Sequence, residues 1–175
     1  IRFEFSDIDQ ASAFATLFTG SNPCFSGIAG DKTFDFEKEK EVSILNDPEY
    51  LGNYTKENYS PKNLFSSTIG DELKIASQGR SDVYSIAPDA ESAILSAGHA
   101  ANGAFWMDNT NGKWATTTYY KGIPWYVDRY NNGPESLASR LETMVWTPTL
   151  PMEKYDAFPY VLDDLPFRYT FSEKF

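Results

Sequence analysis

The side chains that could carry chemistry are few, because the chain has one histidine, His99, and one cysteine, Cys24. A catalytic metal site built on several histidines is therefore impossible within these residues, and so is a structural zinc cluster of cysteines. Cys24 lies between Pro23 and Phe25 with no base nearby, which indicates a buried thiol rather than a nucleophile. His99 has small residues on both sides, which favours a buried hydrogen-bonding role over metal coordination.

Three carboxylates, Asp31, Asp89 and Glu91, are the other candidates. Asp89 and Glu91 suit the first turn of a helix, where the helix dipole favours negative charge. Asp31 follows Gly30 and suits a turn. Together the three carboxylates could hold a divalent cation, but calcium and magnesium sites usually take more oxygen ligands from one loop. The structural interpretation is therefore favoured over the metal site.

The composition limits the classes of partner. The chain has 175 residues and a net charge of −10, and its isoelectric point is near 4.5. This balance argues against nucleic acid or an anionic membrane as a partner, since both require clustered Lys and Arg. A phosphate ester is an unfavourable ligand too, unless metals or a local basic site offset the charge. No apolar run reaches the roughly 18 residues that a membrane span needs.

The ends of the sequence also carry a prediction. No signal peptide is visible. The first residues alternate between apolar and polar, with Ile1, Phe3 and Phe5 as the apolar set, as in an established strand. We interpret the chain as a processed or truncated part of a longer protein.

Residues 93–120 organise the rest of the chain and predict a helix, a glycine turn and a hairpin. Asn111-Gly112 favours a type I′ turn, because both central positions of that turn need a positive φ. The flanking residues 104–107 and 114–120 are rich in aromatic and β-branched side chains, which suit strands. Gly98 and the pair Asn102-Gly103 separate the helix from the first strand.

The remaining pattern predicts alternating strands and helices, which indicates an α/β layer architecture with parallel strand pairing. Thr68 and Asp71 have capping-box spacing, and Ile69, Leu73 and Ala76 share one face of the helix that follows. The further predicted elements are a strand at 1–5, a helix at 10–19 ended by Gly20, an irregular region at 32–63 with a short strand at 41–45, the helix from 68 to a stop at Gly79, a strand at 83–87 followed by a helix opening at 89–92, helices at 123–130 and 135–142, and a surface-wrapping segment from Trp146.

The central stretch also resembles a known family. Residues 93–106 read Ala-Ile-Leu-Ser-Ala-Gly-His-Ala-Ala-Asn-Gly-Ala-Phe-Trp, and residues 112–120 read Gly-Lys-Trp-Ala-Thr-Thr-Thr-Tyr-Tyr. Both are similar to the bacterial phosphate-irrepressible alkaline phosphatases, of the type I phosphodiesterase/nucleotide pyrophosphatase branch of the alkaline phosphatase superfamily. Residues 61–76, 119–131 and 146–148 fit the same pattern.

The family's nucleophile motif resembles residues 10–31 without a gap, but its chemical groups are replaced. The position of the attacking Thr or Ser is Gln10, and an amide cannot attack phosphorus. The position of a phosphate-contacting asparagine is Asp31, which places negative charge where an anion should bind. The motif's proline and two histidines become Ser12, Phe14 and Ser26.

A second family element, the Lys-x-Arg pair that contacts the phosphoryl oxygens, is replaced as well. In this chain Asp89 and Glu91 are at those two positions, so both charges are reversed relative to the guanidinium and ammonium groups that hold phosphate. The family's six zinc ligands would lie before residue 1 and after residue 175. The resemblance thus implies zinc as the family's cofactor and no metal ligand within this chain.

The resemblance implies a partial α/β/α sandwich, with a β-hairpin and an irregular insertion, in which residues 1–175 are a single domain within a larger alkaline-phosphatase-like domain. The expected function is part of a phosphomonoesterase or phosphodiesterase that is catalytically degenerate. The expected partners are a small-molecule phosphate ester and the rest of the parent chain, and the expected location is periplasmic or secreted.

Two alternatives stay open. One is a non-catalytic ligand-binding or interaction module on the same fold. The other is an active enzyme with altered chemistry, in which Asp31, Asp89 and Glu91 serve a cationic or sugar substrate. Whether the chain is an enzyme is therefore undecided by its sequence.

Overall fold

The structure is a computed structural model that describes residues 5, 6, 8–36, 38–146, 169 and 170. These residues form two compact units. The first contains the chain up to residue 108 together with Trp114–Pro124, and the second contains Asn109–Lys113 and the chain from Trp125 onward. The predicted strand at 1–5 falls almost wholly outside the described residues, and so does the predicted wrapping segment beyond Trp146 up to residue 168.

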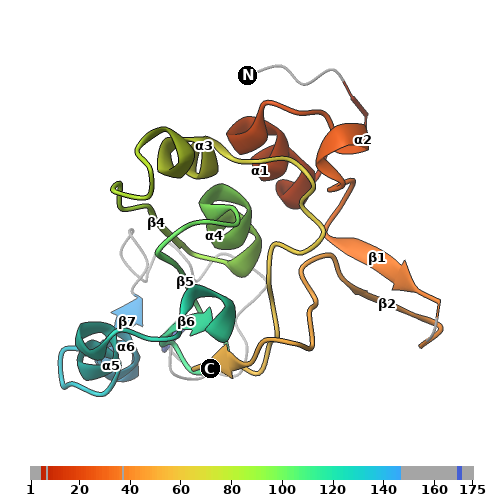
Figure 1. Cartoon of the computed structure of the whole chain (residues 1–175). Helices are drawn as coiled ribbons and strands as arrows, with labels where there is room; N and C mark the ends of the chain where they lie inside the picture. The colour runs from red at the N-terminus through yellow and green to blue at the C-terminus, as the bar shows by residue number, and fades with distance from the viewer. Residues whose placement is uncertain (1–4, 7, 37, 147–168, 171–175) are drawn as a thin grey trace, which may run out of the picture. The chain divides into compact units, whose positions relative to one another are not determined.

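The first unit is built around the helix α4, which lies between two other helices and a mixed sheet (Figure 1). The sheet has the strand order β3-β6-β5-β4, in which β4 and β5 are parallel and the other pairs are antiparallel. The elements of the first unit are α1 (Gln10–Thr19), α2 (Pro23–Ser26), β1 (Lys32–Asp35), β2 (Lys40–Ser43), β3 (Gly52–Asn53), α3 (Ile69–Ala76), β4 (Tyr84–Ala87), α4 (Ala90–Ala97), β5 (Gly103–Met107), β6 (Trp114–Thr117) and the 3₁₀ helix η1 (Thr118–Tyr120).

The second unit contains α5 (Trp125–Asn131), α6 (Leu137–Thr143) and a short antiparallel pair, β7 (Val145–Trp146) with β8 (Tyr169–Thr170). Both predicted helices in this region are therefore confirmed, with slightly different ends. None of the described helices in either unit has the length and hydrophobicity that crossing a bilayer requires.

The core of the first unit joins α1, α4 and the sheet. Helix α1 contributes small side chains that are fully buried, α4 contributes both small and large ones, and the sheet contributes two alanines and one tryptophan. The members that define this arrangement are Ala11, Ala15, Ala93, Ile94, Leu95, Ala97, Ala104, Trp106 and Ala115. The predicted helix at 10–19 and the predicted parallel pairing are both confirmed.

The hairpin after α4 is confirmed, but the predicted two-residue turn is wrong. Trp106 pairs with Ala115 and Met107 with Trp114, so six residues connect the strands. Gly112 has a φ of 64°, whereas Asn111 is not among the described residues with positive φ. The chain after Thr117 turns into η1 instead of continuing as a strand.

The region at 32–63 contains more regular structure than the sequence predicts. The short strand expected at 41–45 is β2, and it pairs with β1, whose residues were not predicted as a strand. Four-residue strands with few buried side chains give a weak alternation signal, which explains why β1 is missed.

The face shared by Ile69, Leu73 and Ala76 is exposed to solvent. The side of α3 that meets the core is instead its small and polar one, formed by the buried residues Gly70 and Asp71. The predicted capping box is present, with the Thr68 hydroxyl accepting from the Asp71 N–H and the Asp71 carboxylate accepting from the Thr68 N–H. Asp71 therefore caps α3 from a buried position.

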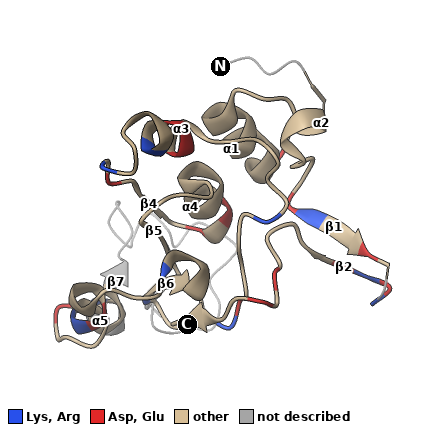
Figure 2. Ribbon diagram, in the orientation of Figure 1, with Lys and Arg blue, Asp and Glu red and all other residues tan. Residues whose placement is uncertain are grey.

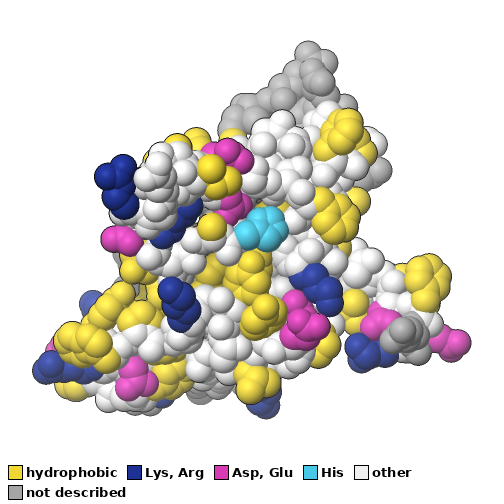
Figure 3. Space-filling model, in the orientation of Figure 1, with side chains coloured by type: hydrophobic (Ala, Val, Ile, Leu, Met, Phe, Trp, Pro, Cys, Tyr) yellow, Lys and Arg dark blue, Asp and Glu magenta, His cyan; other side chains and the backbone are white. Residues whose placement is uncertain are grey.

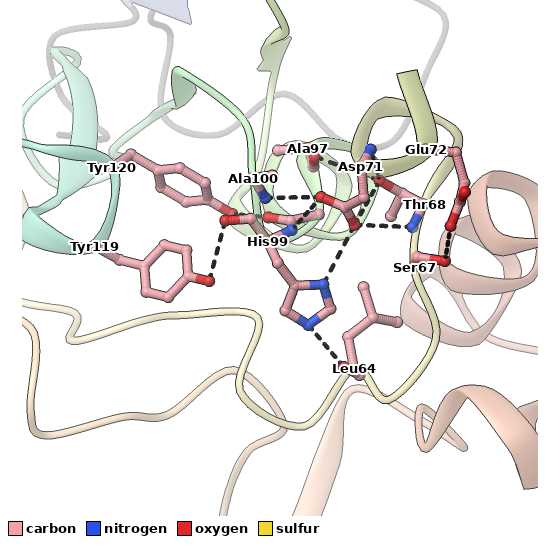
Figure 4. A network of polar contacts seen from close by, with 11 residues as sticks. Leu64, Ser67, Thr68, Asp71, Glu72, Ala97, His99, Ala100, Tyr119 and Tyr120 are labelled. Atoms are coloured by element: carbon pink, nitrogen blue, oxygen red, sulfur yellow. Dashed lines mark hydrogen bonds and ion pairs between the residues drawn. The ribbon is translucent and has the colours of Figure 1, made fainter. Parts of the chain in front are cut away.

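The Asp71 carboxylate also fixes the turn between α4 and β5 (Figure 4). It accepts hydrogen bonds from the backbone N–H groups of His99, at 2.9 Å, and Ala100, at 2.7 Å. Burial alone would raise the pKa of Asp71, but hydrogen bonds from the His99 side chain, the Thr68 and Ala100 N–H groups and the Thr68 hydroxyl hold that pKa well below its ordinary value. The ionised form of Asp71 is thus part of the folded structure.

The His99 ring bridges two acceptors. Its Nδ1 lies 3.2 Å from a carboxylate oxygen of Asp71, and its Nε2 lies 2.8 Å from the carbonyl oxygen of Leu64. Neither oxygen can donate a proton, so both contacts are satisfied together only when both ring nitrogens carry hydrogen. The hydrogen bond to Asp71 raises the pKa of His99, although partial burial opposes it.

Gly98 completes this junction because its backbone is in the left-handed region, at a φ of 74°, directly against α3. A Cβ at this position would overlap the Thr68 hydroxyl and the Asp71 carboxylate. The Gly98 carbonyl accepts a hydrogen bond of 2.8 Å from the buried Tyr120 hydroxyl. The glycine is therefore required by both its φ and the close approach of α3.

We expect Gly98→Ala to lower the free energy of unfolding by about 2 kcal/mol more than Gly79→Ala does. Gly79 is the matched control, because its φ of 78° is similar but nothing lies within 4 Å of an added Cβ. Both variants carry the strain of a positive φ, and Gly98 also has a ψ of −154° that favours glycine, so the difference reports this backbone conformation together with the overlap with α3. Urea denaturation measures it, and equal losses in the two variants would contradict the close packing at Gly98.

We also expect the free energy of unfolding to fall as pH rises through the raised pKa of His99. The stabilisation by the protonated ring is fully present below the ordinary His pKa of 6.5 and is lost above the folded-state pKa. Asp71 acts in the opposite direction, since its stabilisation is lost as pH falls below its ordinary pKa of 3.8. Denaturant unfolding from about pH 5 to about pH 9 measures the His99 effect.

The variant His99→Gln serves as the comparison for this pH profile. It is expected to flatten the profile in that window, because no other histidine is present in the chain. Superimposable profiles of the parent chain and His99→Gln would show that the ring does not control stability.

Candidate functional site

The first turn of α1 is held in a defined position by Asp9. One oxygen of the Asp9 carboxylate accepts from the Ser12 N–H at 2.8 Å, and the Ser12 hydroxyl oxygen accepts from the Asp9 N–H at 3.1 Å. The other Asp9 oxygen accepts from the Asp31 N–H at 2.6 Å. The loop that carries Asp31 is thereby tied to the start of the helix that carries Gln10.

The first turn of α4 is built in a similar way by Asp89. Its carboxylate accepts from the Ser92 N–H at 2.9 Å and from the Ser92 hydroxyl at 3.0 Å. Asp89 is thus the N-cap of α4, as the sequence predicts, and Glu91 lies in the first turn of the same helix.

A single side-chain hydrogen bond joins these two helix starts. The Gln10 amide nitrogen donates to the Ser92 hydroxyl oxygen at 2.7 Å, and that hydroxyl in turn donates to Asp89. Residues 82 positions apart in the chain are therefore in direct contact. The arrangement confirms that α1 and α4 bring their leading ends together.

The charged residues among the four predicted site positions are all acidic. Desolvation raises the pKa of Glu91, and the negative charges of Asp89 and Asp31 raise it further. Among the described residues, the ion pairs found do not include any of these carboxylates. Figure 2 marks in red the acidic residues in the ribbon at the start of α4. The site thus carries like charges, and those of Asp89 and Asp31 disfavour ionisation of Glu91.

All four predicted site positions, Gln10, Asp31, Asp89 and Glu91, are therefore brought together at the leading ends of α1 and α4. Sequence reasoning missed Ser92, which is buried and connects Gln10 with Asp89. The spacing Asp89-x-x-Ser92 is a capping signal that could have drawn attention to it. The bond to Gln10, however, depends on tertiary packing that no local pattern specifies.

Two other predictions need correction. Cys24 is exposed, on the four-residue helix α2 whose buried residue is Ser26. The His99 side chain is hydrogen-bonded as predicted, but 39% of it is exposed, since it lies at the surface end of the α4–β5 turn. Burial was the wrong part of both predictions.

The described residues do not fit a metal ion. No group of three or more His, Cys, Asp or Glu side chains in this part of the chain is placed to hold one. Asp31, Asp89 and Glu91 therefore do not form the divalent-cation site considered from the sequence, and zinc has no set of ligands among them.

Comparison with known proteins identifies relatives along most of the chain, although no family model matches. The chain is 37% identical over 150 residues to the alkaline phosphatase PafA of Elizabethkingia meningoseptica, which covers 83% of this chain and 27% of the relative. It is 34% identical over 159 residues to the alkaline phosphatase PhoV of Synechococcus elongatus, which covers 86% of this chain and 28% of the relative. The chain thus spans somewhat more than a quarter of the relatives it matches.

Solved structures agree with the sequence comparison. The crystal structure of wild-type alkaline phosphatase PafA matches with a TM-score of 0.72 at 36% identity, over 83% of this chain and 29% of that chain. A second crystal structure, of a PafA variant, matches equally well over 84% of this chain and 29% of that chain. The predicted α/β fold of an alkaline phosphatase is confirmed by this likeness.

The substituted positions of the second structure have the same pairwise spacings as the predicted site positions of this chain. The variant has a threonine, an asparagine, a lysine and an arginine substituted. The threonine and the asparagine are as far apart along that chain as Gln10 and Asp31 are here, and the lysine and the arginine are as far apart as Asp89 and Glu91. Shared sequence, fold and order of motifs together show that this chain belongs to the alkaline phosphatase superfamily.

Proposed function

We propose that this chain is part of an alkaline-phosphatase-like phosphoester hydrolase whose catalytic positions are substituted, so that it is catalytically degenerate. The proposal depends most on one observation, the hydrogen bond from the Gln10 amide to Ser92 at the site where a nucleophile would start α1. The N–H protons of an amide are too weakly acidic to be removed near neutral pH, and its carbonyl oxygen is a poor nucleophile toward phosphorus. The residue types at Asp31, Asp89 and Glu91 support the same proposal.

The capping interactions give a second reason. A phosphate at a helix N-terminus uses free backbone N–H groups and the positive end of the helix dipole. Here the side chains of Asp9 and Asp89 already accept from N–H groups in the first turns of α1 and α4. A phosphate would compete with these internal carboxylates and would be repelled by them.

The spacing relation with the PafA variant supports the assignment of positions. If the threonine, asparagine, lysine and arginine of that protein correspond to Gln10, Asp31, Asp89 and Glu91, the site has exchanged a hydroxyl, an amide and two cations for an amide and three carboxylates. Such an exchange removes the attacking group and reverses the charge of the groups that would hold the phosphoryl oxygens.

Finer features of the proposal follow from the superfamily. The chain would be part of one larger domain of the type I phosphodiesterase/nucleotide pyrophosphatase kind, located in the periplasm or secreted. Zinc would be held by parts of that domain outside this chain. The ancestral substrate class would be small phosphate mono- or diesters.

A non-catalytic ligand-binding or interaction module is the second candidate. The observation that favours it is the retention of the capped helix starts and their mutual contact where the reactive groups are replaced. An active enzyme for a cationic or sugar substrate, with Asp31, Asp89 and Glu91 as its contacts, is the third.

Replacing the matched segment of the Elizabethkingia phosphatase with the corresponding residues of this chain tests the proposal. We expect this chimera, supplied with zinc, to show no turnover of aryl phosphate mono- or diesters above background. The combined changes Gln10→Thr, Asp31→Asn, Asp89→Lys and Glu91→Arg are expected to raise turnover on the order of 10³-fold or more, because loss of one electrostatic contact alone costs about 10²–10³.

Two controls accompany this assay. Zinc content by mass spectrometry shows that the chimera is loaded, so a lack of turnover reports the substituted residues. Turnover by the unmodified chimera that disappears in Gln10→Ala would overturn the degenerate function and favour altered chemistry.

The charge of the site yields a separate prediction about stability. Glu91→Gln is expected to raise the free energy of unfolding at pH 7, because the folded state raises the pKa of Glu91 and therefore disfavours its ionised form. The benefit should disappear as pH falls below the ordinary Glu pKa of 4.5. Glu49→Gln, which removes the same charge from an exposed position, is the control, and an equal effect of both changes would argue against repulsion at the site.

A further inference from the structure

The two-stranded ribbon of β1 and β2 in the first unit has an open outer edge. Among the described residues β1 pairs with β2 alone, and most of its residues are exposed. Figure 1 shows the ribbon extending away from α4, and Figure 3 shows hydrophobic side chains beside charged ones at its surface. The open edge of β1 can therefore serve as a template for another strand.

The hydrogen bonding of the ribbon determines which backbone groups face outward. The Asp31 carbonyl accepts from the Ile44 N–H at 2.8 Å, which directs the backbone of residue 31 toward β2. Backbone direction alternates along an antiparallel pair, and β1 keeps one register with β2 over its whole length. The N–H and C=O groups of Lys32 and Phe34 therefore point away from β2.

The outward positions also carry exposed aromatic side chains. Lys32, Phe34 and Phe36 lie on one face of the ribbon, since side chains alternate between the two faces. The two phenylalanine rings meet edge to face with their centroids 5.1 Å apart, and Phe34 and Phe36 are 49% and 85% exposed. An aromatic pair with a lysine next to it is thus displayed beside the open edge.

We propose that the open edge of β1 pairs with the same edge of a second copy of this chain, in an antiparallel register whose two-fold axis passes at Phe34. Each Phe34 then lies opposite Phe34 of the other copy, and each Lys32 lies opposite Phe36. On the other face of the ribbon Thr33 lies opposite Asp35, whose carboxylate can accept from the hydroxyl. Such a contact uses the same patch twice and closes as a dimer. The proposal does not depend on the proposed function.

The chemistry of this register favours a copy of the chain over an unrelated strand. Facing phenylalanines form a stabilising cross-strand pair, and an ammonium group beside a phenyl ring is attracted by the face of the ring. Lysines on an edge usually prevent pairing, but here each lysine meets a ring and not a second lysine. The order Lys-x-Phe-x-Phe at residues 32–36, met in the reverse direction, therefore supplies a partner for each of its own outward side chains.

The neighbouring registers are disfavoured by charge. An axis at Thr33 places Asp31 opposite Asp35 of the other copy, and an axis at Asp35 places the two Asp35 residues opposite each other. Like charges directly opposite each other are destabilising. Registers between these would set outward backbone groups of one copy against residues whose N–H and C=O groups point to β2. The axis at Phe34 avoids both problems.

The negative charge of the whole chain opposes association but does not decide this contact. The net charge is −10, whereas residues 32–41 contain three lysines and four acidic residues, so the ribbon is close to neutral. At about 0.15 M salt, charges separated by more than roughly 8 Å are largely screened. The local charges of the ribbon therefore dominate at the contact.

Charge substitution at Phe34 tests the register, because this residue faces its own copy. Sedimentation equilibrium of the 175-residue chain is expected to show a concentration-dependent dimer at about 0.15 M salt. Phe34→Lys and Phe34→Glu are each expected to weaken the dimer on the order of 10-fold, since like charges then face each other. A mixture of the two variants should dimerise on the order of 10-fold more tightly than either variant alone.

Phe25→Lys and Phe25→Glu are the matched controls. Phe25 is 72% exposed on α2, so these variants change the net charge in the same way at a site away from β1. They should leave dimerisation unchanged, alone and mixed. A parent chain that stays monomeric up to about 1 mM, or a Phe34 mixture that dimerises no better than its components, would overturn the proposal.

Disulfide cross-linking distinguishes the registers. In a Cys24→Ser background, which removes the exposed thiol, Phe34→Cys is expected to form a covalent dimer under air oxidation. Opposite residues of a hydrogen-bonded antiparallel pair have Cα atoms about 5.5 Å apart, which suits a disulfide. Thr33→Cys should remain reduced, because residue 33 faces Asp35 of the other copy. Cross-linking of Thr33→Cys without that of Phe34→Cys would contradict the proposed axis.

Further polypeptide of a larger domain is the other candidate to cover this edge. In the chimera with the Elizabethkingia phosphatase, dimerisation should persist and should respond to the mixed Phe34 variants in the same way. A monomeric chimera beside a dimeric 175-residue chain would show that other parts of the domain cover β1, and it would overturn the proposal.

Discussion

The close packing of α1 on α4 determines where every candidate site residue lies. Both helices face the core with side chains that are small and fully buried, among them Ala11, Ala15, Ala93 and Ala97. Small residues at a helix contact allow the two axes to approach closely. The approach brings the first turns together, and only then can the Gln10 amide reach the Ser92 hydroxyl. The geometry of the site is therefore a property of the core.

Under the proposed function, this dependence explains how a fold can keep a site whose chemical groups have changed. The alanines that position the two helices lie inside, whereas Gln10, Asp31, Asp89 and Glu91 lie at the helix ends and in a loop. Changes at the ends alter charge and reactivity without altering the packed surface. Asp89 even contributes to the fold, since it caps α4, and its negative charge is favourable to the helix dipole while being unfavourable to Glu91.

Elements specified by local chemistry could be predicted from the sequence. The start of α1 near Asp9, its stop at Gly20 and the capping box of α3 follow from patterns within a few residues. The convergence of the four site positions followed from the family resemblance, since no local pattern relates residue 10 to residue 92.

Predictions that depended on tertiary surroundings were less successful. An apolar stripe on α3 normally predicts the buried face of a helix, yet Gly70 and Asp71 occupy that face here, because the contact with the α4–β5 turn is made by hydrogen bonds and a close backbone approach. Cys24 was expected inside because apolar neighbours usually accompany burial, but α2 is a single turn at the surface. The pair Asn111-Gly112 favours a tight two-residue turn, but the chain reverses its direction over a six-residue connection instead.

The two helices that flank α4 are therefore held by different forces, and this difference has a consequence for the site. Contact between α1 and α4 depends on apolar burial, which changes little with pH. Contact between α3 and α4 depends on the ionised Asp71 carboxylate and the His99 ring, whose protonation changes with pH. Loosening of α3 would disturb the turn at Gly98, at the trailing end of α4, while Gln10, Ser92 and Asp89 meet at its leading end. The hydrogen-bonded junction and the candidate site thus occupy opposite ends of one helix, so a change in His99 protonation acts at the end of α4 away from the candidate site.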